Sequence, residues 1–361
     1  MLRSPKEQTA ALSQILGQEC VTTLIANLST QMITTPVGGQ VAPATLNNKV
    51  DAPTCYICCP SVAFINYSIE ETRNFTSNPV LKAGLVGLVR AVAPLVRASG
   101  LDQQLQLNNW LWSTNPVPKL SLNDALAMRD LAQGHPDRAI VLRSLNTRTD
   151  RASIAALRAA GFRLLATRQV YIDDGTANTS NMKYDRKLLR NTPHILVQNH
   201  EFGGGDYAAC ADLYGQLYLS KYTPLNPQYT ARFIELTHQA GLIELTGLRA
   251  QTGALVAFGG TFCHANVLTQ PLVGYDTARP LSEGLYRMTM SQAQSKARAL
   301  GVVLNISAGV GKFKRLRGAR PAVEYTAVYC AHLPRRQRAA VAVMEQLLER
   351  VGVPLLRKYE L

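Results

Sequence analysis

Apolar positions in the second half of the chain alternate between strand spacing and helix spacing, and this pattern predicts a mixed α/β fold. Gly, Pro and Asn residues separate the segments and mark their bounds. Strands are predicted at residues 194–197, 242–249, 255–263, 267–275, 302–306 and 323–329. Helices are predicted at 207–222, 227–240, 283–300 and 335–349, with a short basic helix at 311–317 that Gly318 ends.

The first half of the chain is less regular, and its clearest unit is a strand, a helix that ends at Gly161, and a second strand. The Thr-, Pro- and Gly-rich residues 29–48 predict a loop. The pattern also predicts strand-like structure at 56–69 and helices at 80–98 and 122–133. The resulting division is an irregular N-terminal segment (1–50), a first α/β domain (51–175), a polar connector, a second α/β domain (194–334) and a C-terminal helix (335–361).

A strand–helix–strand unit occurs twice. VLRSLN (141–146) precedes a helix and then GFRLLATRQVY (161–171), whereas VLNISA (303–308) precedes a helix and then GARPAVEYTAVY (318–329). Each copy has an apolar strand, a helix, a glycine and an alternating strand that ends in Val-Tyr. Self-similarity at this scale predicts a duplicated unit.

Composition adds a charge argument. The 361 residues carry a formal net charge of +14, which predicts attraction to polyanions: nucleic acid, an acidic carrier protein or an anionic membrane surface. The N-terminus has no apolar signal-peptide core. The most apolar long window, 81–101, contains Arg90, Pro94 and Arg97, so we expect no membrane span and a cytoplasmic protein.

Metal-binding patterns are missing from the sequence. Cys55, Cys58 and Cys59 lie in an apolar run without a second ligand pair at suitable spacing, and the six histidines are scattered. We therefore expect buried free thiols and no metal site.

The basic charge concentrates between residues 284 and 323, where eight Lys or Arg occur without any Asp or Glu. Four of these cations lie on or just after the short basic helix. At helical spacing, Lys312 and Arg315 share one face, and Lys314 and Arg317 share another. We expect these four side chains to contact donor phosphates, with a solvated helix face as the alternative.

The second half resembles the GNAT superfamily of N-acyltransferases in its order of elements. Asn305, Ala308 and the helical FKRLRG resemble that superfamily's segment from strand five to helix four, which lies against the acyl donor. GFRLLATRQVY looks like a degenerate first copy of the same segment. The chain is thus similar to the Fem-type peptidyltransferases, which take amino acids from aminoacyl-tRNA, and the fold class implied is α/β with two tandem GNAT-like mixed-sheet halves, the first degenerate.

One segment departs from the GNAT pattern. GNAT enzymes that use acyl-CoA carry a Gly-rich pyrophosphate loop after strand four, and the matching residues 276–284 contain one late glycine and Pro280. Arg279 could supply a charged contact instead. The departure favours a donor other than acetyl-CoA.

The resemblance also implies a site beside residues 270–276 and 305–315. Asp276 is the first candidate for the general base and Glu324 the second, with Tyr325 or Tyr329 as an acid toward the leaving group. Because Glu324 and Tyr325 are adjacent on one strand, only one of them can face the cleft. The remaining candidates are Arg279, Asn305 and Ser307 toward the donor, and Lys221, Tyr222, Asn226, Gln270 and Tyr275 toward the acceptor.

These observations favour an N-acyl or aminoacyl transferase that moves an activated acyl group, best from aminoacyl-tRNA, onto a small-molecule amine or related nitrogen nucleophile. An acyl-CoA or an acidic acyl carrier protein is the alternative donor, and no cofactor beyond the activated donor is expected. Two functions without catalysis stay open as well: a nucleic-acid binder, and a structural protein with two decayed halves. Neither a zinc finger nor an RRM signature supports the nucleic-acid binder.

Overall fold

Strands that are mostly buried on both faces form one mixed sheet in the computed structural model, which describes residues 3–48, 55–75 and 78–360. Across the sheet, the strand order is β1-β2-β3-β4-β11-β5-β10-β9-β8-β7-β6. The strands are β1 (Gln31–Val37), β2 (Gln40–Asn47), β3 (Gln104–Leu107), β4 (Ala139–Asn146), β5 (Arg163–Asp173), β6 (Ile195–Val197), β7 (Glu244–Arg249), β8 (Leu255–His264), β9 (Val267–Tyr275), β10 (Val303–Asn305) and β11 (Arg320–Tyr329).

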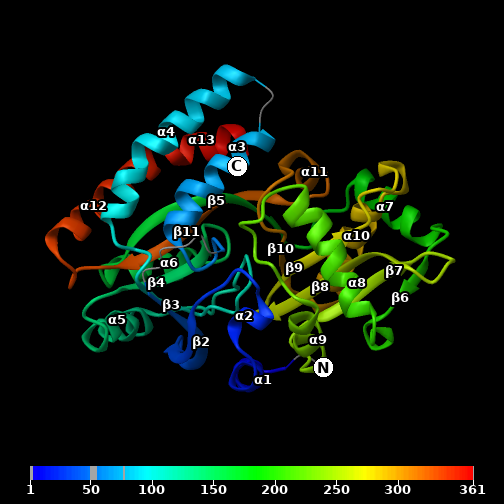
Figure 1. The fold of residues 1–361 in the computed structure, drawn as a ribbon, viewed down its shortest axis with the longest axis horizontal. Coiled ribbons are helices and arrows are strands. Elements are labelled where there is room, and N and C mark those ends of the chain that lie inside the picture. Colours follow the sequence, from blue (N-terminus) through cyan, green and yellow to red (C-terminus); the bar gives the residue numbers. More distant parts are fainter. Residues whose placement is uncertain (1–2, 49–54, 76–77, 361) are drawn as a thin grey trace.

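Helices cover both faces of this sheet, and many begin at a side-chain cap such as Ser4, Asn78 or Thr230 (Figure 1). The α-helices are α1 (Pro5–Gln18), α2 (Val21–Leu24), α3 (Ser68–Phe75), α4 (Pro79–Ala98), α5 (Leu122–Asp130), α6 (Arg151–Ala159), α7 (Ser180–Arg190), α8 (Asp206–Tyr214), α9 (Ala231–Gln239), α10 (Leu285–Leu300), α11 (Gly311–Arg315), α12 (Arg335–Leu347) and α13 (Val353–Tyr359). Within the described residues, π-helical stretches continue or precede them at Val62–Tyr67, Gly215–Ser220 and Leu348–Gly352.

The two halves exchange strands at the centre of the sheet. The last strand of the chain, β11, lies between β4 and β5, and β5 in turn pairs with β10 of the second half. The predicted repeat is confirmed in the topology: β3 and β4 are parallel and lead through α6 to β5, while β9 and β10 are parallel and lead through α11 to β11. The domain boundaries at 175 and 194 remain a prediction.

The parallel strands β9 and β10 pair over a short length and then diverge. Val303–Asn305 pair with residues 267–269, and β10 ends there, whereas β9 continues to Tyr275. Residues 270–275 therefore lie where the chain of β10 has turned away into the loop before α11. The end of α8 packs closely on this part of β9, because a Cβ at Gly274 would lie 2.5 Å from the carbonyl carbon of Leu213.

Several sequence predictions for the first half are wrong. Residues 31–47 are not a loop but the hairpin β1–β2, whose register places Gly38 and Gly39, both with positive φ, at a two-residue turn. Within the range 56–69, which was predicted to be strand-like, residues 62–69 are helical, and α3 continues to residue 75. The connector before residue 194 also contains a helix, α7, which supplies a buried carboxylate, Asp185.

Helix α4 is, among the described residues, the helix that is long and apolar enough to cross a membrane by length and composition. Its C-terminal half packs against the protein through Ala93 and Val96, beside α3 and α12. Arg90, Pro94 and Arg97 lie within it. We therefore treat α4 as a surface helix.

Candidate active site at the centre of the sheet

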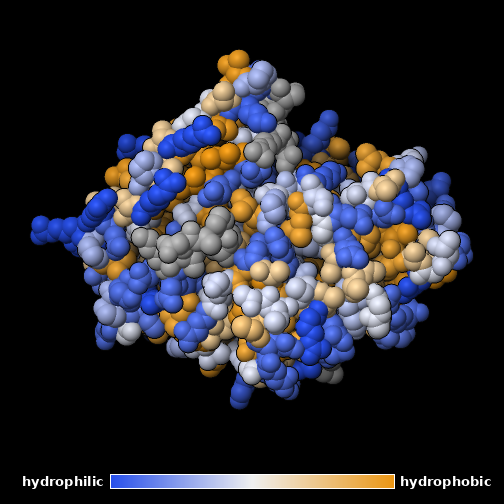
Figure 2. Space-filling model, in the orientation of Figure 1, coloured by the Kyte–Doolittle hydropathy of each residue, from blue (hydrophilic) through white to orange (hydrophobic). Residues whose placement is uncertain are grey.

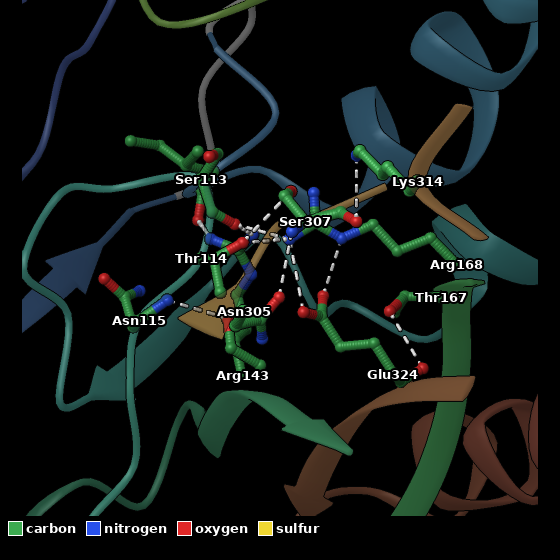
Figure 3. Close-up of polar contacts among 12 residues, drawn as sticks. Ser113, Thr114, Asn115, Arg143, Thr167, Arg168, Asn305, Ser307, Lys314 and Glu324 are labelled. Atoms are coloured by element: carbon green, nitrogen blue, oxygen red, sulfur yellow. Dashed lines mark hydrogen bonds and ion pairs between the residues drawn. The ribbon is translucent and has the colours of Figure 1, made fainter. Parts of the chain in front are cut away.

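An ion pair between a buried carboxylate and an arginine whose side chain is 19% exposed joins the two exchanged strands. Arg168 on β5 lies opposite Glu324 on β11, and its Nε and Nη2 atoms donate to the two carboxylate oxygens at 2.8 and 3.2 Å. The Glu324 side chain is only 3% exposed. Arg168 Nη2 also donates to the Ser113 carbonyl and to Thr114 Oγ1, so the pair fixes the loop after β3 over the centre of the sheet (Figure 3).

The chain turns sharply where β10 ends. Ser307 and Val310 both have positive φ, +60° and +46°, which is a strained conformation for a β-branched residue such as Val. The turn is held by side chains: the Ser307 N–H donates to Asn305 Oδ1 at 2.9 Å, and Thr114 Oγ1 donates to Ser307 Oγ at 3.1 Å. Two otherwise distant segments thus meet at Ser307, from both halves of the protein.

Lys314 on α11 completes this turn. Its Nζ donates to the carbonyl oxygens of Ile306, Ser307 and Ala308 at 2.7, 3.2 and 2.6 Å, and the residue is 2% exposed. Burial, together with the nearby Arg168 charge, lowers the pKa of Lys314 to about 7. Lys314 therefore fixes the turn from inside and titrates near neutral pH.

We expect the Lys314→Met variant to differ from the wild type in how stability changes with pH. The folded-state pKa of about 7 lies below the usual 10.5. Below pH 7 the buried lysine is protonated in the folded state, and this lowers the free energy of unfolding of the wild type. Between pH 7 and 10.5 the folded state has lost this proton while the unfolded state keeps it, so the free energy of unfolding rises with pH. The free energy of unfolding of the wild type minus that of the variant should therefore rise by about 2 kcal/mol between pH 7 and 9.

Urea denaturation at several pH values measures this difference. Lys312→Met, an exposed lysine on the same helix, is the control and should show no such rise. A pH-independent difference for Lys314→Met would show that Lys314 titrates in its usual range.

Partly exposed aromatic rings lie beside the Arg168–Glu324 pair. The rings of Tyr56 and Tyr67 are 4.6 Å apart, and the Arg143 guanidinium lies 6.0 Å from the Tyr56 ring. Tyr67 hydrogen-bonds to Glu71, and burial raises the pKa of both groups. Tyr67 comes from a helical stretch that the sequence pattern assigned to strands.

The second half contributes its own row of aromatic rings. Tyr275 at the end of β9 lies 6.3 Å from Tyr286, and Tyr286 lies 5.2 Å from Phe313 on α11. Tyr222, a predicted acceptor residue, packs 6.0 Å from Tyr218. Burial raises the pKa values of Tyr218, Tyr222 and Tyr286, so these partly exposed phenols keep their protons at neutral pH and can donate hydrogen bonds.

The predicted division of the basic helix into two faces is confirmed. Lys314 and Arg317 point inward and are buried, whereas Lys312 and Arg315 are exposed. Arg317 forms an ion pair with Asp185, and its guanidinium lies 3.5 Å from the Phe313 ring centroid. The inward pair therefore organises the site rather than following a polynucleotide along the surface.

Acidic residues from other segments neutralise most of the basic run. Six of its eight cations form ion pairs within the described residues, and a seventh, Lys314, binds carbonyl oxygens. The six ion pairs are Arg287–Asp185, Lys296–Glu244, Arg298–Asp173, Arg315–Glu360, Arg317–Asp185 and Arg320–Asp174. The strong positive potential expected from the sequence is thus largely balanced by tertiary contacts.

The loop that corresponds to the GNAT pyrophosphate loop is closed on itself. Arg279 forms ion pairs with Asp276 at 3.4 Å and Glu283 at 3.1 Å, so its charge is already matched. Five backbone N–H groups of the loop donate hydrogen bonds within the protein. Those of Thr277 and Ala278 donate to side chains, Gln216 Oε1 and Asp276 Oδ1. Those of Arg279, Glu283 and Gly284 donate to the carbonyl oxygens of Asp276, Pro280 and Leu281. Asp276 itself has a side chain that is 33% exposed, directly after β9.

Other predicted residues have varied surroundings. Asn226 is buried and donates to the carbonyls of Tyr218 and Thr223, so it shapes a turn. Gln270 donates to the Thr289 carbonyl, and Lys221 is exposed at the end of its helix. Tyr325 packs in the cluster that includes Val353, and its hydroxyl donates to Glu349, on the opposite side of β11 from Glu324.

Sequence reasoning missed several residues of this site. Arg168, Arg143 and Thr114 were not among the predicted residues, nor were Tyr67 and Glu71. The sequence did carry a signal for Arg168. An arginine within the apolar alternating run LLATRQVYI must bury its charge against a partner. The two helical residues gave no signal: Tyr67 lies within the range 56–69 that was assigned to strands, and Glu71 lies just after it.

Cysteine placement agrees with buried thiols. Cys55, Cys58 and Cys59 are buried, and burial raises their pKa values, to about 11 for Cys59. The part of the chain that the structure describes contains no group of three or more His, Cys, Asp or Glu side chains placed to hold a metal ion.

Comparison with known proteins identifies the fold. No protein-family model and no curated protein matches the sequence. FemX matches at a TM-score of 0.51 and 8% identity over 96% of this chain and 99% of its own. The protein has a FemX-like fold, so the predicted class of two GNAT-like halves is confirmed.

Weaker structural matches include two further proteins. The C-terminal domain of a putative lysylphosphatidylglycerol synthetase from Agrobacterium fabrum has 14% identity and a TM-score of 0.47, over 72% of this chain and 91% of that one. L-PGS from Bacillus licheniformis has 12% identity and a TM-score of 0.44, over 60% and 75%.

Proposed function

We propose that this protein is an N-acyltransferase that moves an aminoacyl group from aminoacyl-tRNA to a small-molecule amine. The observation that carries the proposal is the divergence of β9 and β10 at residue 305, next to the braced turn at Ser307, within a FemX-like fold. In the GNAT superfamily, which the sequence resembles, the acyl donor lies beside this pair of strands.

The closed loop at residues 276–284 favours aminoacyl-tRNA over acyl-CoA. A pyrophosphate needs free backbone N–H groups and positive charge. Here most of the loop's N–H groups donate to acceptors within the protein, and the carboxylates of Asp276 and Glu283 pair with Arg279. An anion would have to displace these contacts, whereas an aminoacyl ester can be held through the tRNA.

The chemistry requires three things of the site: alignment, proton removal from the amine and stabilisation of the developing oxyanion. Asp276 is the proposed base, because its carboxylate is partly exposed directly after β9. The role of Glu324 is then to hold Arg168, since both of its oxygens accept from that guanidinium. Tyr286, with a protonated phenol near α11, replaces Tyr325 as the proposed hydrogen-bond donor.

The test is donor use under single-turnover conditions. Purified protein is incubated with a mixture of radiolabelled aminoacyl-tRNAs and amines, in parallel with labelled acetyl-CoA and an acyl carrier protein. We expect loss of label from one aminoacyl-tRNA and its appearance on an amine. Transfer from acetyl-CoA or from the carrier protein alone would support the other donor class, and an inert protein would contradict the enzyme proposal.

A further inference from the structure

Helix α4 presents an apolar surface that the other described residues leave partly exposed. Val80 is 79% exposed and Leu88 is 39% exposed. Leu81 and Leu85 are also partly exposed. In Figure 1 the helix extends outward at the top of the molecule, beyond the sheet and its other helices.

The packing of α4 changes along its length. Its C-terminal half buries Ala93 and Val96 in a core cluster. In the N-terminal half, Cβ atoms added at Gly84 and Gly87 would meet nothing within 4 Å. Packing against the folded core therefore explains the apolar residues in the C-terminal half of α4. It does not explain those in the N-terminal half, where the apolar side chains stay at least partly exposed.

Charge on this surface has a single sign. Within α4 the charged residues are Lys82, Arg90 and Arg97, with no carboxylate. The start of the neighbouring α12 adds the exposed side chains of Arg335, Arg336 and Arg338. Figure 2 shows strongly hydrophilic side chains interleaved with apolar ones over this helix. Apolar side chains rimmed by cations match the boundary of an anionic bilayer, where acyl chains and phosphate groups meet.

We propose that the exposed face of α4, with the first turn of α12, binds the surface of an anionic membrane. The helix lies in the plane of the interface, with Val80, Leu85 and Leu88 among the acyl chains and the cations at the phosphates. RNA fits this surface less well, because a polynucleotide backbone interacts favourably with cations but makes no favourable contact with exposed Val and Leu side chains. Since α3 packs against α4 and carries Glu71, binding also brings the candidate site close to the membrane.

Vesicle co-sedimentation tests the proposal with the full-length protein and no substrate. We expect binding to vesicles that contain phosphatidylglycerol, weaker binding to phosphatidylcholine alone, and loss of binding at high salt. The double variant Val80→Asp with Leu88→Asp should bind the anionic vesicles roughly tenfold or more weakly, because it places two charges in the apolar contact.

Leu281→Asp provides a matched control, because Leu281 is 83% exposed on a different element and should bind as the wild type does. The unfolding midpoint of each variant checks that the fold is intact. Absence of vesicle binding, an equal effect of Leu281→Asp, or binding unchanged in the double variant would each overturn the proposal. So would a tRNA affinity that falls in the double variant while vesicle binding is unchanged.

Discussion

Replacement of Glu324 by Gln is expected to lower the free energy of unfolding by about 3–5 kcal/mol. The variant keeps the shape of the side chain but removes the charge that compensates Arg168 in the middle of the sheet. Glu324 is almost wholly buried, and both carboxylate oxygens accept from the guanidinium. The arginine would then remain charged between β11 and β5 with neutral acceptors alone: the Ser113 carbonyl, the Thr114 hydroxyl and the amide oxygen of the substituted side chain.

Urea denaturation of the single variant and of a matched control measures this effect. Arg163, on the same strand β5, forms an ion pair with Glu345 on α12, but its side chain is 42% exposed. Glu345→Gln should therefore cost about 0–1 kcal/mol. The double variant Arg168→Met with Glu324→Met should recover most of the lost stability, because no buried charge remains. A cost below about 1 kcal/mol for Glu324→Gln would contradict a buried, charged pair.

The second half of the fold could be predicted because its signals are local. The hairpin β7–β8, the long helix α10 and the last strand β11 each have a clear period and glycine or proline punctuation. The same is true of the repeated strand–helix–strand unit. The exchange of β5 and β11 between the halves could not be predicted, because strand order depends on contacts far apart in sequence.

The hairpin β1–β2 shows a different limit. The loop prediction for residues 29–48 was based on composition, since the segment contains Pro36, Pro43 and two consecutive glycines. Two glycines between Thr- and Val-containing runs are also the signal for a two-residue hairpin turn. Because β1 is an edge strand, Pro36 is tolerated there.

Charge was the least predictable property of the candidate site. The acid-free run from 284 to 323 suggested a phosphate-binding surface, yet Asp173, Asp185 and Glu244 approach it from other elements. A count of charges along the sequence includes only residues that are neighbours in the chain. The electrostatic potential at a site depends on all charges within about 10 Å in space. The division of α11 into inward and outward faces was predictable, because helical spacing alone determines it.

Asp276→Asn is expected to reduce the single-turnover rate of transfer by about 10²–10⁴-fold, if the carboxylate accepts the proton of the amine. Asparagine keeps the size of the side chain and can still accept from the Ala278 N–H through its amide oxygen, so the turn after β9 should persist. Donor affinity should change little, because the loop carrying Asp276 is not proposed to bind phosphate. The rate and the affinity therefore need to be measured separately, the second by titration of the unreacted donor.

Glu283→Gln is the matched control for this experiment. Glu283 lies in the same loop and shares Arg279 with Asp276, so its loss disturbs the same ion-pair network without removing the proposed base. A rate close to wild type in Glu283→Gln, together with a large loss in Asp276→Asn, would assign proton transfer to Asp276. Equal losses in both variants would instead make the network a structural element that positions β9. A near-wild-type rate in Asp276→Asn would exclude it as the base, and Glu71, whose pKa is raised by burial beside Tyr67, would then be the next carboxylate to test.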